Sequence, residues 1–355
     1  MVLIAGPRQV GKTTLALQIA GGDKGYLNWD VPEHRERILR RRLPATSLWV
    51  FDELHKYRSW RGYLKGLYDA KTLTRNQKIL VTGSARLDYY RFGGDSLQGR
   101  YFFWRLHPLS VAELKIGTLR DFMELLTLGG FPEPFFSSSE IESKRWSREY
   151  RTRLIQDDLL SLEHISDVGK LELLMLRLPE LAGSPLSLNA LREDLQVNHK
   201  TVERWIEVLE RLYAVFRIPP FGAPKIRAVK KEQKCYHYDW TRINDKGLRF
   251  ENCVACHLLK WVHYQQDAHG RNLELRYFRD VDRREIDFVV VEDRKPIQCI
   301  ECKWKESELN PALFYFKKRF PSCDALQIAA ISKETSQTPE GIRLMPAVDF
   351  LKTLV

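Results

Sequence analysis

Long apolar runs are missing from this sequence of 355 residues. None approaches the roughly 18 to 20 residues that a membrane-spanning helix needs, so we expect no membrane span and no membrane partner. The chain also lacks a basic segment followed by an apolar stretch at its start, which is the pattern of a secretory signal. Together these absences predict a cytoplasmic protein.

Cysteine is also scarce, with 6 residues in the chain, and in the cytoplasm these do not argue for disulfides. Two Cys-x-x-Cys pairs, Cys253/Cys256 and Cys299/Cys302, have a spacing that zinc sites use. The first pair lies in a predicted helix and the second on a predicted strand, and neither geometry readily supplies four tetrahedral ligands. We therefore interpret these cysteines as buried thiols.

Acidic residues are few in the N-terminal third. Residues 1–112 hold 19 Lys and Arg against 9 Asp and Glu, whereas the rest of the chain holds 38 against 37. A basic region of this kind suits phosphate-bearing ligands and is compatible with nucleic acid. A dense group of arginines between residues 35 and 42 is interpreted as a solvated helix face rather than a specific contact surface.

The clearest motif lies at the start of the chain. Residues 6–13 read GPRQVGKT, between an apolar strand-like run and a predicted helix, which is the G-x-x-x-x-G-K-[ST] pattern in the context it requires. The glycines would let backbone N–H groups face the phosphates of ATP, and the helix N-terminus would add a favourable dipole. Lys12 would neutralise phosphate charge, and the Thr13 hydroxyl would coordinate Mg²⁺.

Two acids end the next strongly apolar strand, which is predicted at residues 47–53. Acids at the carboxyl end of such a strand lie beside the phosphate loop in a parallel sheet. We predict that Asp52 holds Mg²⁺ and that Glu53 polarises the attacking water, as in a Walker B motif. An ordinary strand end is the alternative, but the upstream loop favours the functional interpretation.

Two further segments add candidates to this site. Residues 78–84 form a predicted strand that would lie between the two motif strands, where Thr82 or Ser84 could orient the water; a simple polar strand exit is the alternative. Arg100 precedes a predicted strand at 101–106 and could reach a nucleotide in the same chain or in a neighbouring subunit, although the sequence alone favours a surface ion pair. The predicted nucleotide-binding set is Gly6, Pro7, Arg8, Gln9, Val10, Gly11, Lys12, Thr13, Thr14, Asp52 and Ser84.

The middle of the chain has helical patterns. Residues 111–178 are interpreted as a helical connector, and predicted helices at 187–195 and 199–212 are separated by a tight turn. A strand and a basic hairpin candidate follow, which together indicate a winged helix. His199, Lys200 and Arg204 would then face DNA. A winged helix used only for packing is a serious alternative, because the same helix carries three glutamates that phosphate would repel.

The last section holds a second chemical set. An aspartate on one predicted strand and Glu-x-Lys on the next would bring Asp287, Glu301 and Lys303 to one spot. Carboxylates of this kind can hold Mg²⁺ at a scissile phosphate while the lysine stabilises charge, and Glu251 on the preceding helix would complete the site. The alternative is a lysine–carboxylate network that stabilises the sheet edge.

The order of these motifs resembles that of bacterial and archaeal AAA-type ATP-binding proteins whose C-terminal half is an uncharacterised domain. The resemblance runs nearly end to end, through G-P-R-Q-V-G-K-T, F-D-E-L, T-G-S, G-R-Y-F-F, G-G-F-P-E-P and the closing E-I-D-F-V-V and I-E-C-K. It implies a winged helix joined to a restriction-endonuclease-like fold of the PD-(D/E)xK type. Members usually carry a further stretch before the P-loop, and His55 stands where glutamine often follows the Walker B segment.

The sequence therefore predicts an α/β protein with four parts. These are a P-loop ATPase domain at 1–110, a helical connector at 111–178, a winged-helix-like domain at 179–240 and a restriction-endonuclease-like domain at 241–355. The expected function is a Mg²⁺-dependent ATPase, with ATP and Mg²⁺ as cofactors, that couples nucleotide state to nucleic acid, DNA rather than RNA. The alternative is an NTP-gated regulatory DNA-binding protein with little turnover and an inactive nuclease-like fold; a homo-oligomer is left open.

Overall fold

The computed structural model describes residues 1–70, 77–83, 97, 99–159, 167–222, 233–332 and 334–354, without the side chains of 157–159. The chain divides into two compact units. The first comprises Met1–His107 with Arg211–Tyr213, and the second comprises Pro108–Glu210 with Ala214–Val355. Each unit has its own sheet and its own hydrophobic core.

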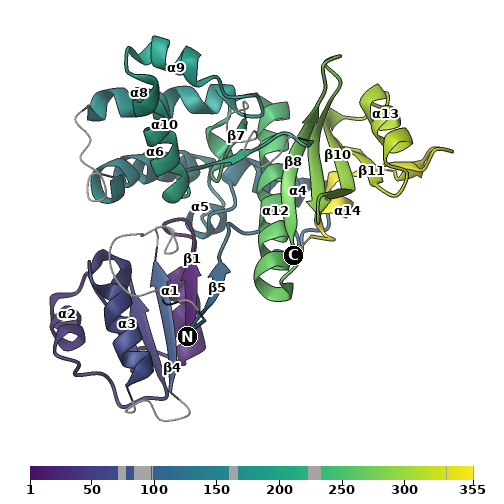
Figure 1. Ribbon diagram of the computed structural model, residues 1–355. Helices are drawn as coiled ribbons and strands as arrows, with labels where there is room; N and C mark the ends of the chain where they lie inside the picture. Colours follow the sequence, from purple (N-terminus) through teal and green to yellow (C-terminus); the bar gives the residue numbers. More distant parts are fainter. Residues whose placement is uncertain are drawn as a thin grey trace. The chain divides into compact units, whose positions relative to one another are not determined.

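The first unit is built on a parallel sheet of five strands in the order β2-β3-β4-β1-β5 (Figure 1). The strands are β1 (Val2–Ala5), β2 (Tyr26–Asn28), β3 (Leu48–Asp52), β4 (Lys78–Gly83) and β5 (Phe102–Arg105). The helices are α1 (Lys12–Ala20), α2 (Pro32–Leu39), the 3-10 helix η1 (Leu54–Lys56) and α3 (Trp60–Asp69).

This sheet forms because its central strands are apolar on both faces, as parallel strands covered by helices are. Ile4, Val50 and Leu80 from three neighbouring strands pack with Ala16 of α1 in one buried cluster. The strands predicted in this part of the chain are present, and β4 lies between β3 and β1 as predicted. Since all five strands run in the same direction, the P-loop after β1 and the acids after β3 come to the same edge of the sheet.

The second unit begins with helices, as predicted for the connector in the parts that the structure describes. They are α4 (Leu119–Leu128), α5 (Pro132–Phe136), α6 (Glu140–Arg153), the π-helix η2 (Leu154–Leu159), α8 (Val168–Arg177) and the 3-10 helix η3 (Leu178–Leu181). Hydroxyl caps fix two of the starts, because Thr118 accepts a hydrogen bond from the N–H of Asp121 and Ser139 accepts one from Glu142.

A helix–turn–helix follows, made of α9 (Leu188–Leu195) and α10 (His199–Arg211). Gln196 adopts a left-handed conformation with φ 51° in the turn. Two short antiparallel strands come next, β6 (Val215–Ile218) and β7 (Lys234–His237). This element order fits the predicted winged helix, which stays a prediction; the basic hairpin candidate between the two strands lies outside the described residues.

The C-terminal part of the second unit is a six-stranded sheet in the order β12-β13-β11-β10-β9-β8. Its strands are β8 (Leu273–Arg279), β9 (Glu285–Glu292), β10 (Lys295–Lys305), β11 (Asp324–Ile331), β12 (Ser336–Gln337) and β13 (Ile342–Pro346). Its helical elements are η4 (Trp240–Arg242), α12 (Lys246–His269), α13 (Pro311–Arg319) and α14 (Ala347–Leu351). The strands β8, β9 and β10 pair in sequence order and antiparallel, as their short connections predict.

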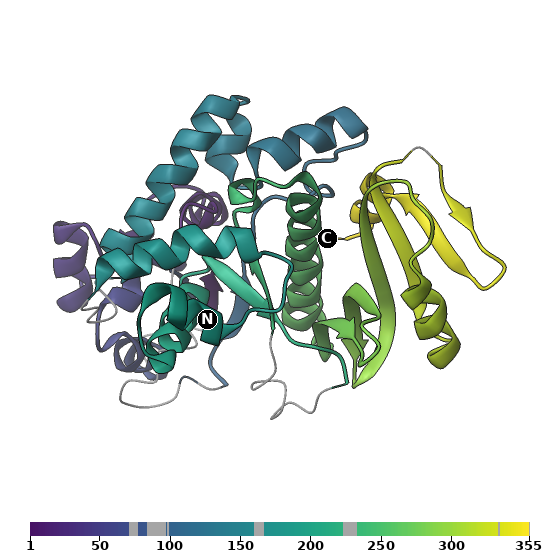
Figure 2. The ribbon, with the colours of Figure 1, turned by 90° about the horizontal axis from the view of Figure 1, so that it is seen from above.

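Two helices cover this sheet from opposite sides. The long helix α12 packs on β8 and β10, while α13 packs on β9 and β11 (Figures 1 and 2). On the α13 side an apolar core forms, with Phe316 among Ile286, Val289 and Leu313. Within the described part of the chain, no helix is both long enough and apolar enough to cross a membrane.

Candidate nucleotide site and carboxylate cluster

Two glycines give the P-loop its shape, for different reasons. Gly6 follows β1 at a point where an added Cβ would overlap the carbonyl of Leu106, so only glycine fits there. Gly11 has φ 100° and precedes the first residue of α1. Because the chain turns at these positions, the N-terminus of α1 faces the carboxyl edge of the sheet, where an anion would be favoured.

Lys12 is buried and bonded to its own loop. Its Nζ donates to the carbonyl oxygens of Gly6 at 3.1 Å and of Pro7 at 2.5 Å. These are neutral acceptors that the phosphate oxygens of a nucleotide could replace. The ammonium therefore stands at the loop, as the predicted role of Lys12 requires.

The two motifs meet through a hydrogen bond. The Thr13 hydroxyl donates to Oδ2 of Asp52 at 2.7 Å, across 39 positions of sequence. Mg²⁺ favours oxygen ligands, and here one hydroxyl and one carboxylate lie within reach of a single ion. The side chains present thus fit the predicted ion, with Thr13 and Asp52 as the residues that would hold it.

Asp52 receives two more hydroxyls that orient its carboxylate. Tyr26 donates to Oδ2 at 2.7 Å from β2, and Thr82 donates to Oδ1 at 2.5 Å from β4. Thr82 was a predicted candidate, but it contacts the acid rather than standing free to meet water. Tyr26 was missed, because only the strand order brings β2 beside β3. Ser84 lies outside the described residues.

Glu53 has a left-handed backbone conformation with φ 55°, which is uncommon for a residue other than glycine. Its carboxylate lies 3.3 Å from Nζ of Lys56 and 3.7 Å from Nε2 of His55. Burial lowers the pKa of His55, so that its ring is held neutral. The predicted water-activating acid is therefore at the right edge of the sheet, with its charge partly engaged by Lys56.

The predicted role of Arg100 within its own chain is wrong. β5 pairs with β1 in parallel, with Phe102 opposite Val2, so Arg100 lies at the amino end of the sheet. The P-loop leaves the other end. The Arg100 guanidinium instead pairs with Asp69, with Nε 3.0 Å from Oδ1. This is the surface ion pair that the sequence alone favoured, and a role in a neighbouring subunit stays a prediction.

In the second unit, the predicted carboxylates come together. Phe288 lies opposite Ile300 in the β9–β10 ladder, which places Asp287 beside Glu301. The backbone N–H of Cys302 donates to Oδ2 of Asp287 at 2.9 Å. Lys303 Nζ lies 2.8 Å from Oε1 of Glu301, so the two share a face as predicted.

A buried lysine that the sequence did not indicate lies at the centre of this cluster. Lys234 of β7 is only 1% exposed, and its Nζ lies 2.7 Å from Glu285, 3.4 Å from Asp287 and 3.6 Å from Glu251. Tyr236, two residues on, donates to Glu251 at 2.7 Å. We call Lys234, Glu251, Glu285, Asp287 and Glu301 the carboxylate cluster.

The charges of this cluster are strongly coupled. Burial alone would lower the pKa of Lys234, but the charges of Glu251, Asp287 and Glu285 raise it above its ordinary value. Burial, followed by the charge of Asp287, raises the pKa of both Glu251 and Glu301. The ammonium therefore offsets carboxylates that would otherwise repel one another.

The predicted Mg²⁺ site at Glu251, Asp287 and Glu301 is not preformed. Of the His, Cys, Asp and Glu side chains that the structure describes, no three are grouped so that they could hold a metal ion. The acids surround an ammonium instead. Metal binding at this place stays a prediction, and no chemical step can be derived through it.

The predicted nucleic-acid residues lie on the outside of α10. His199, Lys200 and Arg204 are exposed, while Val202 and Trp205 of the same helix are buried. One of the opposing glutamates is neutralised, because Glu210 pairs with Arg217 at 2.7 Å. Lys200 and Arg204 thus place positive charge on the exposed side of this helix, and the Glu210–Arg217 ion pair lies near its C-terminal end.

Family models match three successive parts of the chain. Residues 1–115 match the family model described as AAA domain. Residues 119–241 and 246–348 match two models described as domains of unknown function, DUF8612 and DUF4143. The predicted winged helix and endonuclease-like domain remain predictions after these matches.

Two curated mycobacterial proteins are similar to the chain. They are the uncharacterized proteins Mb2031c of Mycobacterium bovis and Rv2008c of Mycobacterium tuberculosis, each 26% identical over 253 residues. The match covers 70% of this chain and 55% of each relative. The chain therefore spans about half the length of these relatives.

Two solved structures are distantly similar. One is the replication initiator DnaA bound to AMPPCP and single-stranded DNA, at 12% identity and a TM-score of 0.32, covering 59% of this chain and 81% of that one. The other is ORC1 of Aeropyrum pernix in complex with DNA, at 16% identity and a TM-score of 0.31, covering 72% and 86%. These TM-scores are too low for a property of either protein to be assigned to this chain. Residues 1–115 are thus similar to AAA domains, and the parallel sheet with the Thr13–Asp52 contact has the geometry of a P-loop nucleotide-binding fold.

Proposed function

We propose that this chain is a Mg²⁺-dependent ATPase whose nucleotide state controls nucleic-acid binding by the C-terminal half. One observation carries the ATPase proposal. The Thr13 hydroxyl at the start of α1 lies 2.7 Å from the Asp52 carboxylate at the end of β3. That contact brings a phosphate loop and a metal-binding acid to one point, which phosphoryl transfer requires.

Each residue of the site then has one role. When ATP binds, the Lys12 ammonium exchanges its hydrogen bonds to the carbonyls of Gly6 and Pro7 for hydrogen bonds to phosphate oxygens. The N–H groups that begin α1 face the same phosphates. Thr13 and Asp52 would hold a Mg²⁺ ion, which would supply neutralisation of phosphate charge. Glu53 accepts a proton from the attacking water after its contact with Lys56 opens.

The nucleic-acid part of the proposal rests on α10 and its surroundings. Residues 201–250 hold 11 Lys and Arg against 6 Asp and Glu, and His199, Lys200 and Arg204 are exposed on one helix. Exposed cations of this kind bind phosphate backbones with a strong dependence on salt. DNA is the expected polymer, because a helix–turn–helix presents its second helix to a major groove.

The test is ATP turnover with Mg²⁺, measured without polymer and with duplex DNA, single-stranded DNA or RNA. Lys12→Ala and Glu53→Gln should each lower turnover by at least about 100-fold. Lys24→Ala is the matched control, since it removes one exposed lysine from the same unit. Equal phosphate release by wild type and both site variants would refute catalysis at this loop.

The same variants separate a second candidate, the NTP-gated DNA-binding protein with negligible turnover. Its support is the contact of 3.3 Å between the Glu53 carboxylate and Nζ of Lys56, which has to open before Glu53 can accept a proton from water. If nucleotide changes DNA affinity equally in wild type and Glu53→Gln, and neither turns over ATP, the gated binder is favoured. Stimulation of turnover by one polymer would favour the coupled ATPase.

The C-terminal unit has its own proposed activity to be tested. Its order of α12, β8, β9, β10, α13 and β11 supports the endonuclease-like prediction, and Asp287 beside Glu301 supports a metal site there. The Lys234 ammonium supports the inactive alternative. To decide between the active and the inactive site, wild type and Asp287→Ala are incubated with plasmid DNA, linear DNA or RNA in Mg²⁺ or Mn²⁺. Cleavage by this site should be present in wild type and absent in Asp287→Ala.

A homo-oligomer is proposed on one condition, that Arg100 acts on the nucleotide of a neighbouring subunit. Sedimentation with and without ATP would detect the assembly. Arg100→Ala should then lower turnover only at protein concentrations where the assembly forms. Loss of turnover in the dilute monomer would instead indicate a fault in the fold, since Arg100 lies at the wrong end of its own sheet.

A further inference from the structure

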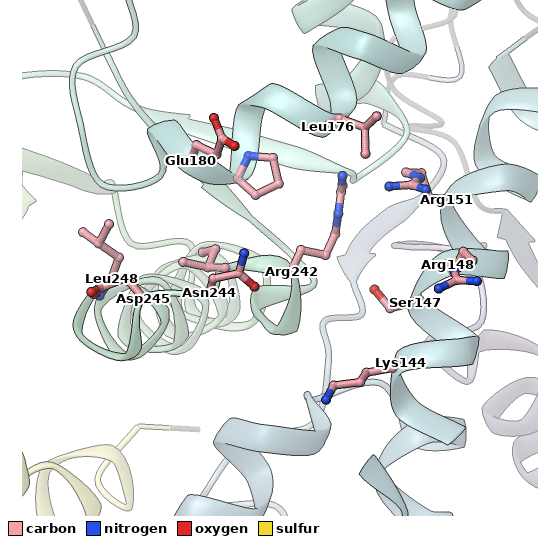
Figure 3. Close-up of a pocket in the computed structure, with 12 residues that line it drawn as sticks. Lys144, Ser147, Arg148, Arg151, Leu176, Glu180, Arg242, Asn244, Asp245 and Leu248 are labelled. Carbon is pink, nitrogen blue, oxygen red and sulfur yellow. The ribbon is translucent and has the colours of Figure 1, made fainter. Parts of the chain in front are cut away.

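A basic pocket in the second unit is used by none of the sites above. It has a volume of about 500 Å³ and lies between α6, the end of α8 with η3, and residues 242–248. Four cationic side chains line it: Lys144, Arg148 and Arg151 from α6, and Arg242 from η4 (Figure 3). Figure 3 shows Arg242 on the opposite wall from the α6 side chains.

The spacing along α6 explains why three cations share one wall. Residues 144, 148 and 151 are separated by four and three positions, so they lie on one helix face. The same helix buries Trp146 and Tyr150 on its core side. Its other basic residues point elsewhere and are paired, because Arg145 contacts Glu142 at 3.0 Å and Arg153 contacts Glu149 at 2.7 Å.

Arg242 is held in place on the facing wall. Its Nη2 donates to the carbonyl of Met175, which fixes the guanidinium at the pocket. Burial lowers the pKa of Arg242 to about 10; the charge of Asp239 opposes this shift and that of Arg151 adds to it. The positive charge of Arg151 thus acts on Arg242 across the pocket, and an anion bound between the two would reduce this repulsion.

The four basic side chains outnumber the two acids that line the pocket, Glu180 and Asp245, and both acids contact other groups. Glu180 pairs with Arg177, and Asp245 accepts the N–H of Leu248 at 2.8 Å as the N-cap of α12. Among residues that the structure describes, Arg148 and Arg151 form no ion pair, and Lys144 has only the exposed Glu140 at 2.7 Å. Two guanidinium groups in the pocket wall are thus available to a ligand.

We infer that this pocket binds a phosphate group. Guanidinium groups bind phosphate through paired N–H donors, and here two of them face a third that is already oriented. The phosphate could belong to a nucleic-acid backbone or to a small soluble phosphate, because the recognition chemistry is the same. In the first case the inference rests on the proposed nucleic-acid binding; in the second it stands without it.

The test uses the full chain in a Lys12→Ala background, so that the P-loop does not contribute. Arg148→Gln with Arg151→Gln is compared with Arg145→Gln with Arg153→Gln, which removes the same charge from the other faces of the same helix. Pyrophosphate binding is measured by calorimetry. Binding of a fluorescent single-stranded oligonucleotide is measured by anisotropy over a series of salt concentrations.

We expect the pocket double variant to lose at least about tenfold in affinity for one of the two ligands, and the control to change by less than about threefold. Loss confined to pyrophosphate identifies a small phosphate as the ligand. Loss for the oligonucleotide, with the slope of log affinity against log salt reduced by about 0.7, the value for one phosphate contact on a single strand, identifies the backbone. Equal behaviour of the two double variants for both ligands, or no binding of either ligand by the parent, would overturn the inference.

ATP turnover of the pocket double variant with Lys12 intact separates this result from the ATPase proposal. Turnover without polymer should be unchanged, since the pocket and the P-loop belong to different units. If the pocket binds phosphate and the chain does not turn over ATP, the pocket inference holds and the ATPase proposal is refuted. If the chain turns over ATP and the pocket binds no phosphate, the ATPase proposal holds and the pocket inference is refuted.

Discussion

Lys12 and Lys234 are both buried lysines placed near acids, one in each unit, yet their surroundings differ. Lys12 donates to two backbone carbonyls, and the nearby Asp52 accepts hydroxyls from Thr13, Tyr26 and Thr82. Lys234 lies instead within 3.6 Å of three carboxylates. These contacts of Lys12 and Asp52 are with neutral groups, whereas those of Lys234 are with opposite charges.

This difference decides which site is ready for a ligand. Exchange of a neutral hydrogen bond for a phosphate or a metal ion costs little, because the net value of such a bond is only about 1 kcal/mol. Exchange of a buried ammonium leaves carboxylates without a counter-charge, which costs several kcal/mol. The P-loop is therefore open to a charged ligand, whereas the carboxylate cluster already contains its cation.

The largest expected effect comes from removal of the Lys234 ammonium from the carboxylate cluster. Lys234→Met should destabilise the second unit by about 3 to 5 kcal/mol, because it leaves Glu285, Asp287 and Glu251 without their shared ammonium. Lys305→Met, at an exposed lysine of β10, is the control and should change stability by no more than about 0.5 kcal/mol. Urea titration with hydrogen exchange of peptides from β9 and β10 measures both.

The same variant shows whether a metal can replace the lysine. Mn²⁺ should raise the urea midpoint of Lys234→Met and leave that of wild type unchanged. A loss of stability no larger than that of Lys305→Met would show that the ammonium is not the counter-charge of this cluster. Equal stabilisation of wild type by Mn²⁺ would show that the acids accept a metal with the lysine in place.

A second prediction compares one aspartate from each site. Asp52→Asn should lower Mg²⁺-dependent ATP turnover by at least about 100-fold, because it removes the negatively charged ligand of the ion that Thr13 and Asp52 would hold. Asp287→Asn should leave turnover within about twofold, since it lies in the other unit. Phosphate release over a Mg²⁺ series measures both, and a matching loss in Asp287→Asn would contradict the separation of the two sites.

The nucleotide site was predictable because its signals are local. The P-loop lies within eight residues, and Asp52 follows an apolar strand whose direction fixes where its side chain lies. The failure of Arg100 as an arginine finger within its own chain could also have been found. It precedes its strand, and in a parallel sheet that is the end away from the ligand.

The residues that were missed depend on long-range pairing. Tyr26 reaches Asp52 only because β2 is the neighbour of β3, and a three-residue strand gives little warning of that. Lys234 comes from a strand 53 positions before Asp287. One signal was present: a lysine in a strand that is otherwise buried requires a carboxylate partner, although the sequence does not say which.

A smaller effect follows from the raised pKa values of Glu251 and Glu301. An acid whose pKa is raised by folding stabilises the fold below its ordinary value near 4.5, and that contribution is lost as pH rises through the raised value. The urea midpoint of β9 and β10 should therefore fall as pH rises from about 4.5 toward neutrality. Glu251→Gln with Glu301→Gln should flatten this trend; an unchanged slope would show that other groups cause it.

The smallest expected effect concerns the hydroxyls around Asp52. Tyr26→Phe removes one of three donors and leaves the ring, so we expect a loss of about 1 kcal/mol in the stability of the first unit. Because Mg²⁺ would replace such a donor, the loss should shrink when Mg²⁺ and a non-hydrolysable ATP analogue are bound. Tyr68→Phe, at a tyrosine that is 44% exposed, is the control and should have no measurable effect. Urea titration with and without the ligands measures the difference. A loss that stays constant would show that Tyr26 still bonds Asp52 beside the ion, so that the neutral donors of this site are not exchanged on binding.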